Sequence, residues 1–463
     1  MKSHIQHLWP YPLTRKVKVL GVVGVNNLLT KEFLDKMPDL LVKEVAEKSK
    51  CVSESVLDPA LQSLKATVQD HFPSLWPAVD LGLATCATLL LQDNVNPVAV
   101  IYVGPPSTGK STVLEMFGDA RVSGKVFCYV SDSFTPASFV SQAANVKKEK
   151  LAEVDLLPRI QHKVLVTPEL APIFRGKEEE LAKTFTVLTR VLDGQGYQCD
   201  SGTHGQRGYR GDYVFSWLGG TTPFDKKVWK VMSQLGSRLF FLLMDQEEAI
   251  TLEALVHPSS SIPYAARLGE CRKAVHEFLP ILFEHYQGIR GVAWNPQEED
   301  SELREWIGRC AMLLAKTRSA PLCHDSPGSE EAPWRAYAVL HNLARGHALV
   351  HGRTQLAWED FPLIAQVTCS TMPFPMGMLF RALAQNPQGK LTRTEVQDLL
   401  AVESHNTAQM VMEEIGQSGV IKYFALGQGQ ASYLTFDKEW EWCGLGDYRT
   451  ILSANLSKVG GCA

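Results

Sequence analysis

The sequence lacks a long apolar run and a secretory leader. Its most apolar stretch, residues 81–91, is too short to cross a bilayer and has polar flanks. Residues 1–9 contain no sustained apolar segment of the kind found in signal peptides. These absences exclude an integral membrane protein of the helical type. They favour a soluble, cytoplasmic protein without a membrane partner.

Paired cysteines and an excess of basic charge are also absent. The ten cysteines are scattered without a Cys-x-x-Cys pair, which favours reduced thiols. Cys323 and His324 form one adjacent pair with no second pair at zinc-finger spacing, so we expect no zinc finger. With 46 basic and 50 acidic residues the formal net charge is −4, which confines any nucleic-acid surface to a local patch.

What the chain does have is a glycine-rich motif between an apolar run and an amphipathic one. Residues 104–111 read Gly-Pro-Pro-Ser-Thr-Gly-Lys-Ser and satisfy GxxxxGK[ST]. The run Val98–Val103 predicts a buried strand before the motif, and residues 111–117 have helical spacing after it. In such a turn, backbone N–H groups and the positive end of the helix surround a polyphosphate. We therefore expect a site for ATP and Mg²⁺ formed by Gly104, Pro105, Pro106, Ser107, Thr108, Gly109, Lys110, Ser111 and Thr112.

Apolar runs alternate with helical patterns after this motif. The runs are Val126–Val130, Val164–Val166 and Tyr213–Leu218, separated by helical patterns near residues 136–150 and 178–192. This alternation predicts an α/β fold with a parallel, doubly wound sheet.

The length of 463 residues is enough for about three domains. We expect four parts. These are an N-terminal accessory segment (1–70), an α/β nucleotide-binding core (71–255), a helical lid (256–370) and a C-terminal domain (371–463).

The nucleotide motif assigns roles to two of its residues. Lys110 is expected to contact the terminal phosphates, and the Ser111 hydroxyl to bind Mg²⁺. Hydrolysis also needs a carboxylate at the end of a neighbouring strand. Two acids qualify, because Asp132 and Glu169 each follow an apolar run. We favour Glu169 and keep Asp132 as its rival. Residue type does not separate a metal ligand from a general base at Glu169.

The order of these features resembles the AAA+ ATPases. A polar segment, Gly-Gly-Thr-Thr-Pro at residues 219–223, ends the fourth run, and Gly-Ser-Arg at residues 236–238 precedes a last apolar run. Within that group the chain is most similar to the minichromosome-maintenance (MCM) clade, which has Ser-Arg-Phe where this chain has Ser-Arg-Leu. The resemblance implies that Thr222 is sensor 1. It also implies that Arg238 is the arginine finger supplied to the nucleotide of the next subunit in a ring or arc.

The predicted lid carries a further part of the resemblance. Residues 332–348 are similar to the sensor 2 helix of the same clade, which assigns Arg335 as its arginine. Pro168 and Thr222 depart from the family, because an aspartate and an asparagine are usual there, so we expect slow hydrolysis. The segment before residue 76 shows none of the zinc-bearing N-terminal domain of replicative members. This difference argues against a replicative helicase.

A glycine-rich segment, residues 192–212, carries Arg207 and Arg210 together with Tyr197 and Tyr209. In the related motors this position is a hairpin that projects into a central pore. Arginine and tyrosine side chains suit phosphate contacts and base stacking. We therefore expect Arg207 and Arg210 to contact DNA, with a solvated hairpin that has no ligand as the alternative.

The C-terminal domain resembles a winged helix-turn-helix. Thr394 is expected to cap its first helix, and His405, Asn406 and Gln409 to lie at the start of its second. The second helix has no Lys or Arg, so DNA reading and protein docking both remain open.

These features predict an ATPase that translocates on or remodels DNA outside replication, as in mobile-element or genome-maintenance ATPases. Two other functions stay open. One is a nucleotide-gated switch or loader that recruits a protein through the winged helix. The other is a transcription regulator that reads an operator.

Overall fold

The computed structural model describes most of the chain after residue 55. The described residues are 56–141, 150–201, 205–235, 238–244, 261–319, 331–425, 432–444 and 448–449. Contacts divide the chain into two units, residues 1–55 and 56–463, and all described residues belong to the second unit. Cys323 and His324 lie outside the described residues.

A five-stranded parallel sheet, ordered β4–β5–β8–β1–β9, lies at the centre of the α/β core. Its strands are β1 (Val98–Val103), β4 (Cys128–Val130), β5 (Val164–Thr167), β8 (Ser216–Thr221) and β9 (Leu239–Leu243). Ala99 of β1 pairs with Trp217 of β8 on one side and with Leu239 of β9 on the other. The predicted α/β fold with a parallel sheet is confirmed.

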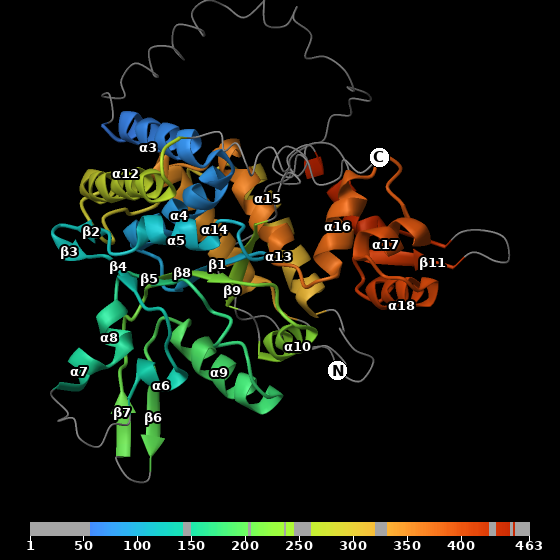
Figure 1. Cartoon of the computed structure of the whole chain (residues 1–463), viewed down its shortest axis with the longest axis horizontal. Coiled ribbons are helices and arrows are strands. Elements are labelled where there is room, and N and C mark those ends of the chain that lie inside the picture. Colours follow the sequence, from blue (N-terminus) through green and yellow to red (C-terminus); the bar gives the residue numbers. More distant parts are fainter. Residues whose placement is uncertain are drawn as a thin grey trace, which may run out of the picture. The chain divides into compact units, whose positions relative to one another are not determined.

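Helices cover both faces of this sheet (Figure 1). One face carries α3 (Leu57–His71), η1 (Pro73–Leu75), α4 (Trp76–Ala87), η2 (Thr88–Leu90), α5 (Lys110–Phe117) and α12 (Tyr264–His285). The other carries α6 (Pro136–Phe139), α7 (Leu151–Val154), α8 (Leu156–Ile160), α9 (Glu178–Val191) and α10 (Lys226–Leu235). Val100 and Tyr102 of β1 enter the first core, and Ala99 and Ile101 enter the second. Both faces of β1 are therefore buried, as expected for a central parallel strand.

Two elements differ from the predicted ones. The helix expected at residues 136–150 begins as α6, but α6 ends at Phe139 because the backbone of Val140 is extended. The fourth strand runs from Ser216 to Thr221 and includes Gly219 and Gly220. Their lack of side chains matters, because a Cβ on Gly219 would lie 2.5 Å from Leu170 Cδ1 and one on Gly220 would lie 2.7 Å from the Pro168 carbonyl oxygen.

The helices expected to form a lid share an apolar core with α4 and α5. They are α13 (Ser301–Ser319), α14 (Trp334–Val350), η4 (Trp358–Asp360) and α15 (Phe361–Ser370). The Phe241 N–H of β9 donates to Thr371 Oγ1 at 2.9 Å, which fixes the end of α15 to the sheet. The compact unit begins before the expected boundary at residue 70, because α3 packs its apolar face on α12.

The C-terminal part has helices around a small antiparallel sheet ordered β10–β12–β11. Its elements are α16 (Met376–Gln385), β10 (Leu391–Thr392), α17 (Arg393–Leu400), α18 (His405–Gly416), β11 (Ile421–Phe424), β12 (Tyr433–Phe436) and η5 (Lys438–Gly444). Thr392 caps α17, since its Oγ1 accepts the Glu395 N–H at 3.4 Å and Glu395 Oε2 accepts the Thr392 N–H at 2.6 Å. The prediction that Thr394 caps this helix was wrong, because Thr394 lies inside the first turn.

Two hairpins complete the described fold: β2 (Arg121–Val122) with β3 (Lys125–Val126), and β6 (Gln198–Ser201) with β7 (Gly205–Gly208). Among the helices that the structure describes, none combines the length and apolarity needed to cross a membrane.

Candidate functional site

The predicted phosphate loop connects the end of β1 to the start of α5. Gly109 has a φ of +87°, and a Cβ there would lie 2.6 Å from Leu75 Cδ2. At Gly104 a Cβ would lie 2.2 Å from the carbonyl oxygen of Met244. Both glycines of the motif are therefore required by the backbone conformation or by close packing.

Lys110 is the buried cation of this loop, with 8% of its surface exposed. Its Nζ donates to the carbonyl oxygens of Gly104 at 2.8 Å and Pro105 at 2.6 Å. Burial lowers the pKa of Lys110, and the negative charge of Glu169 opposes that effect. Lys110 thus lies within electrostatic reach of Glu169. Ser111, which follows it, is exposed.

The strand order separates the two candidate carboxylates. Glu169 follows β5, two strand positions from β1, whereas Asp132 follows the edge strand β4, three positions away. At about 4.8 Å per strand these offsets are roughly 10 and 14 Å. Both carboxylates are exposed, but the charge of Glu169 is the one that acts on Lys110, so the geometry favours Glu169. Its Oε1 accepts the Ala171 N–H at 2.8 Å.

β8 lies between the phosphate-loop strand and the strand of Glu169. The Gly104 N–H donates to the Thr221 carbonyl oxygen at 3.2 Å, and the Leu170 N–H donates to the Gly220 carbonyl oxygen at 2.7 Å. The end of β8 is therefore tied to both neighbouring loops. Thr222, the next residue, is half-buried. The carboxyl edge of the sheet thus brings together Lys110, Thr222 and Glu169.

Gly104→Ala is expected to loosen this edge. The new methyl group meets a backbone oxygen of Met244 that no side-chain rotation can move. We expect the free energy of unfolding to fall by about 1–3 kcal/mol, measured by urea denaturation. Gly269→Ala is the matched control, because Gly269 lies in α12 with nothing within 4 Å of its added Cβ. Equal stability of the two variants would contradict the packing described here.

The two other predicted arginines lie at the opposite edge of the sheet. Arg238 immediately precedes β9, and Arg335 Nη1 lies 3.4 Å from Asn96 Oδ1, just before β1. β1 has six residues, so these arginines are about 20 Å from the carboxyl edge that carries Lys110. Arg238 and Arg335 therefore do not reach the predicted phosphate loop of their own chain.

Asp193, which the sequence did not indicate, brings the arginines together. Its Oδ1 lies 2.6 Å from Arg335 Nη2 and 3.4 Å from Arg238 Nη2, and its Oδ2 lies 3.2 Å from Arg190 Nη1. Burial and the repulsion of Arg238 lower the pKa of Arg335, while Asp193 and Glu331 oppose the shift. One carboxylate contacts three guanidinium groups, so this arginine cluster (Arg190, Arg238, Arg335) has the electrostatics of an anion site.

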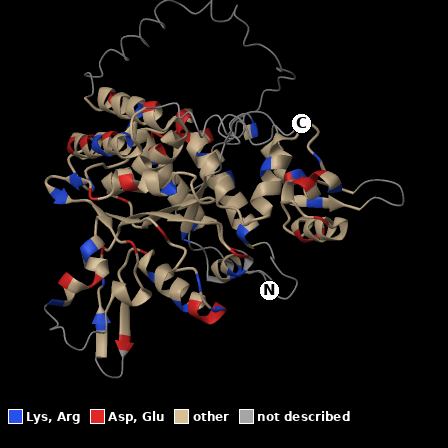
Figure 2. Cartoon of the chain, in the orientation of Figure 1, with Lys and Arg blue, Asp and Glu red and all other residues tan. Residues whose placement is uncertain are grey.

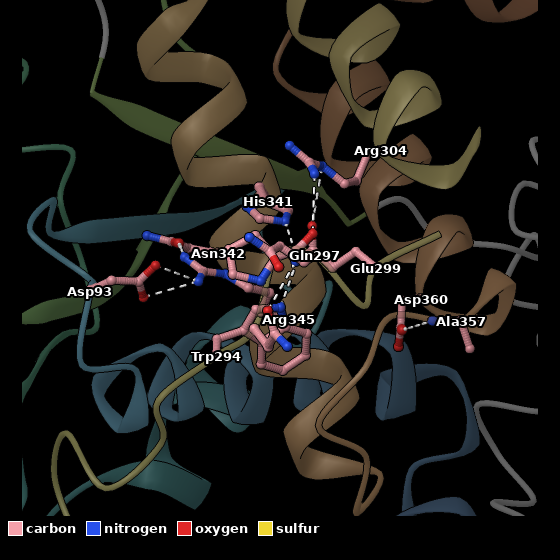
Figure 3. A network of polar contacts seen from close by, with 12 residues as sticks. Asp93, Trp294, Gln297, Glu299, Arg304, His341, Asn342, Arg345, Ala357 and Asp360 are labelled. Atoms are coloured by element: carbon pink, nitrogen blue, oxygen red, sulfur yellow. Dashed lines mark hydrogen bonds and ion pairs between the residues drawn. The ribbon is translucent and has the colours of Figure 1, made fainter. Parts of the chain in front are cut away.

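A polar network fixes α14, the helix that begins with the sequence Trp334–Arg335. Figure 3 shows Glu299 beneath His341, with Glu299 Oε1 at 2.7 Å from His341 Nε2 and at 2.6 Å from Trp294 Nε1. Burial raises the pKa of Glu299, but the hydrogen bonds from His341 and Trp294 outweigh it and hold the pKa below its usual value.

The same helix is also held to the segment before β1. Arg345 Nη1 contacts both oxygens of Asp93 at 2.9 and 2.8 Å (Figure 3). Asn342 Nδ2 donates to Asn94 Oδ1 at 3.0 Å. These contacts fix the helix that carries Arg335 relative to the sheet.

The glycine-rich segment forms the β6–β7 hairpin, which extends away from the sheet (Figure 1). Arg207 lies on β7, and Arg210 follows it with Nε hydrogen-bonded to Gln198 Oε1. Figure 2 shows basic charge on β7 and acidic charge on the neighbouring β6, so the hairpin carries charges of both signs.

The tyrosines of this hairpin support its base. Tyr209 is half-buried and donates to Asp155 Oδ2 at 2.8 Å, and its ring packs against Tyr213. Tyr197 is also half-buried and packs on the second core. Both tyrosine rings therefore take part in packing at the base of the hairpin, and their predicted stacking on bases stays a prediction.

A scan against models of known protein families found no match, and a search of curated proteins found none either.

Proposed function

We propose that this chain is an ATPase of the AAA+ type, similar to the MCM clade, which hydrolyses ATP between neighbouring copies of itself. One observation carries the proposal. Lys110 and the arginine cluster lie at opposite edges of the same parallel sheet. A single copy therefore presents half of a hydrolytic site at each edge. Head-to-tail contact, which builds rings or open arcs, would join the two halves.

Each residue at the carboxyl edge has a role in this proposal. The buried ammonium of Lys110 exchanges its loop carbonyl oxygens for phosphate oxygens. Ser111, through its hydroxyl, and Glu169 would hold Mg²⁺, which would supply positive charge to neutralise the phosphates. Glu169 or Thr222 orients the attacking water, since both flank the space beyond β8. Arg238 and Arg335 of the neighbouring copy stabilise the charge that develops on the transferring phosphoryl group.

The C-terminal part is proposed to be a winged helix-turn-helix that docks a protein. The order α16–β10–α17–α18–β11–β12 and the three-stranded sheet support the fold. His405 and Asn406 are exposed at the start of α18, and Gln409 Nε2 donates to Glu413 Oε1 at 2.9 Å. Met410 is 65% exposed on this helix, which has no Lys or Arg. An apolar and acidic surface favours a protein partner over a DNA phosphate backbone.

The proposal that the ATPase remodels DNA rests on the β6–β7 hairpin. We expect the double variant Arg207→Ala with Arg210→Ala to lose the stimulation of ATPase activity by DNA. Loss of two phosphate contacts should also make the slope of log DNA affinity against log salt concentration shallower by about two. Basal ATPase activity should stay within about twofold, because the hairpin is remote from Lys110. The measurements are ATPase rates with and without single- and double-stranded DNA, and DNA binding at several salt concentrations.

The second candidate function is a nucleotide-gated switch that recruits a protein through α18 and hydrolyses rarely. The exposed Met410 and the absence of Lys and Arg on α18 favour it. The DNA-stimulated ATPase assay separates the two functions. If the wild-type rate is unchanged by either form of DNA and neither form binds, the motor function is refuted and the switch remains. An operator-reading regulator would instead give a sequence-specific footprint.

A further inference from the structure

Three potential metal ligands meet between the helix that precedes β1 and the end of the lid helix. Asp80 lies on α4, His347 lies in the last turn of α14, and His351 caps that helix. One ligand atom from each lies within 4.8 Å of the other two. His347 and His351 are four residues apart and so lie on one face of the helix.

The separations between ligand atoms suit a small cation. His347 Nε2 lies 3.2 Å from Asp80 Oδ2, and His351 Nε2 lies 3.6 Å from Asp80 Oδ1. A tetrahedral zinc ion with bonds of about 2.0–2.2 Å separates its ligand atoms by roughly 3.3–3.6 Å. The three side chains would need only small adjustments to share one ion.

The surroundings fix His347 in the orientation of a metal ligand. Its Nδ1 lies 2.6 Å from Asp360 Oδ1, so this nitrogen donates its proton and Nε2 faces Asp80. Asp360 is held in turn by two hydrogen bonds from Arg353, at 2.6 and 2.8 Å. It also accepts the Ala357 N–H at 2.8 Å (Figure 3). A carboxylate behind a ligating histidine is the usual support of a zinc site.

Two buried atoms of the cluster, Asp80 Oδ1 and His351 Nε2, have no partner within hydrogen-bond distance. They face one another across 3.6 Å, as a long ion pair that a shared metal ion would replace. Buried polar atoms are seldom left unsatisfied, and an ion is one of the groups that satisfies them. The His347 side chain beside them is only 7% exposed.

We propose that Asp80, His347 and His351 bind one Zn²⁺ ion, with a fourth position open to water. Imidazole nitrogens with one carboxylate oxygen match zinc, whereas Mg²⁺ prefers oxygen ligands alone. The site is therefore chemically distinct from the Mg²⁺ site proposed at Ser111 and Glu169. By joining α4 to α14, the ion would fix the lid helix to the nucleotide core. The inference does not depend on ATP hydrolysis.

The test is a titration of the purified full chain, stripped of metal, with Zn²⁺ and with Co²⁺ as a coloured substitute, in the absence of nucleotide. We expect one ion per chain and the visible absorption of tetrahedral Co²⁺. The spectrum should lack a thiolate-to-cobalt band, because no cysteine belongs to the cluster. His347→Gln and His351→Gln should each weaken binding by at least about 100-fold, and Asp360→Asn by about 10–100-fold.

His285→Gln is the matched control, since it removes an exposed histidine at the end of α12 and should bind the ion as the wild type does. His351 is half-exposed, so its variant tests the site with little risk to the fold, and circular dichroism checks each variant. Without a metal, His347 is an ion-pair bridge: burial opposes its protonation, but Asp360 and Asp80 raise its pKa to about 9. Equal zinc affinity of folded His351→Gln and wild type, or no bound ion, would overturn the metal site and leave this bridge.

Discussion

Lys110→Ala is expected to abolish ATP binding, with a loss of affinity of at least about 100-fold. The ammonium is the buried cation of the loop and donates to the carbonyl oxygens of Gly104 and Pro105. Hydrogen bonds to charged groups contribute about 1.5–3 kcal/mol each, and a triphosphate would take up more than one of them. The measurement is a calorimetric titration with a non-hydrolysable ATP analogue and Mg²⁺.

The control separates lost binding from a collapsed loop. Lys125→Ala removes an exposed lysine of β3 and should leave affinity unchanged. Because the variant at Lys110 also loses two hydrogen bonds within the loop, its melting temperature without nucleotide must be compared with that of the wild type. A variant at Lys110 that keeps its fold and binds the analogue within threefold of the wild-type affinity would refute the nucleotide site.

Arg238→Ala is expected to leave ATP binding intact and to lower the turnover of assemblies by about 10³-fold. The reason is positional, because Arg238 lies at the amino edge of the sheet, away from Lys110 of its own chain. In the proposed assembly it would act on the nucleotide of a neighbouring copy. Arg335→Ala should behave similarly, since both guanidinium groups contact Asp193 Oδ1. Binding is measured by titration, and turnover by phosphate release.

Arg190→Ala is the matched control for this prediction. Arg190 contacts the other oxygen of the same Asp193, but its side chain is 57% exposed, so we expect turnover within a few-fold of the wild type. Full turnover by a monomeric Arg238→Ala protein would contradict the assigned role. Equal losses in the Arg190 and Arg238 variants would indicate that the cluster is structural.

The parts of the site that sequence could predict are those formed by neighbouring residues. The phosphate loop is a continuous segment in which the positions of Gly104, Gly109 and Lys110 follow from one motif. The choice between Asp132 and Glu169 could not be made locally, because it depends on β8 lying between β5 and β1. Strand order is a property of the whole chain and leaves no mark in a single segment.

Contacts between residues far apart in the sequence could not be predicted, for the same reason. Asp193 is 142 residues from Arg335 and 45 from Arg238, and only the fold brings them together. Similarly, the spacing of His347 and His351 can be read from one helix, but Asp80 lies 267 residues from His347. The prediction of the residue that caps α17 was wrong for a more local reason. Thr392 and Thr394 are both suitable caps, and the strand β10 decides where the helix begins.

The sharing of one hydrolytic site by two copies is tested most directly by mixing Lys110→Ala with Arg238→Ala. Each variant alone should be inactive, because every junction lacks either the loop lysine or the arginine. In a random equal mixture about a quarter of the junctions pair the intact loop of one variant with the intact arginine of the other. We expect ATPase activity to recover to about that fraction of the wild-type rate. A mixture that stays inactive, while mass measurement shows both variants in the same assemblies, would contradict a site shared between copies.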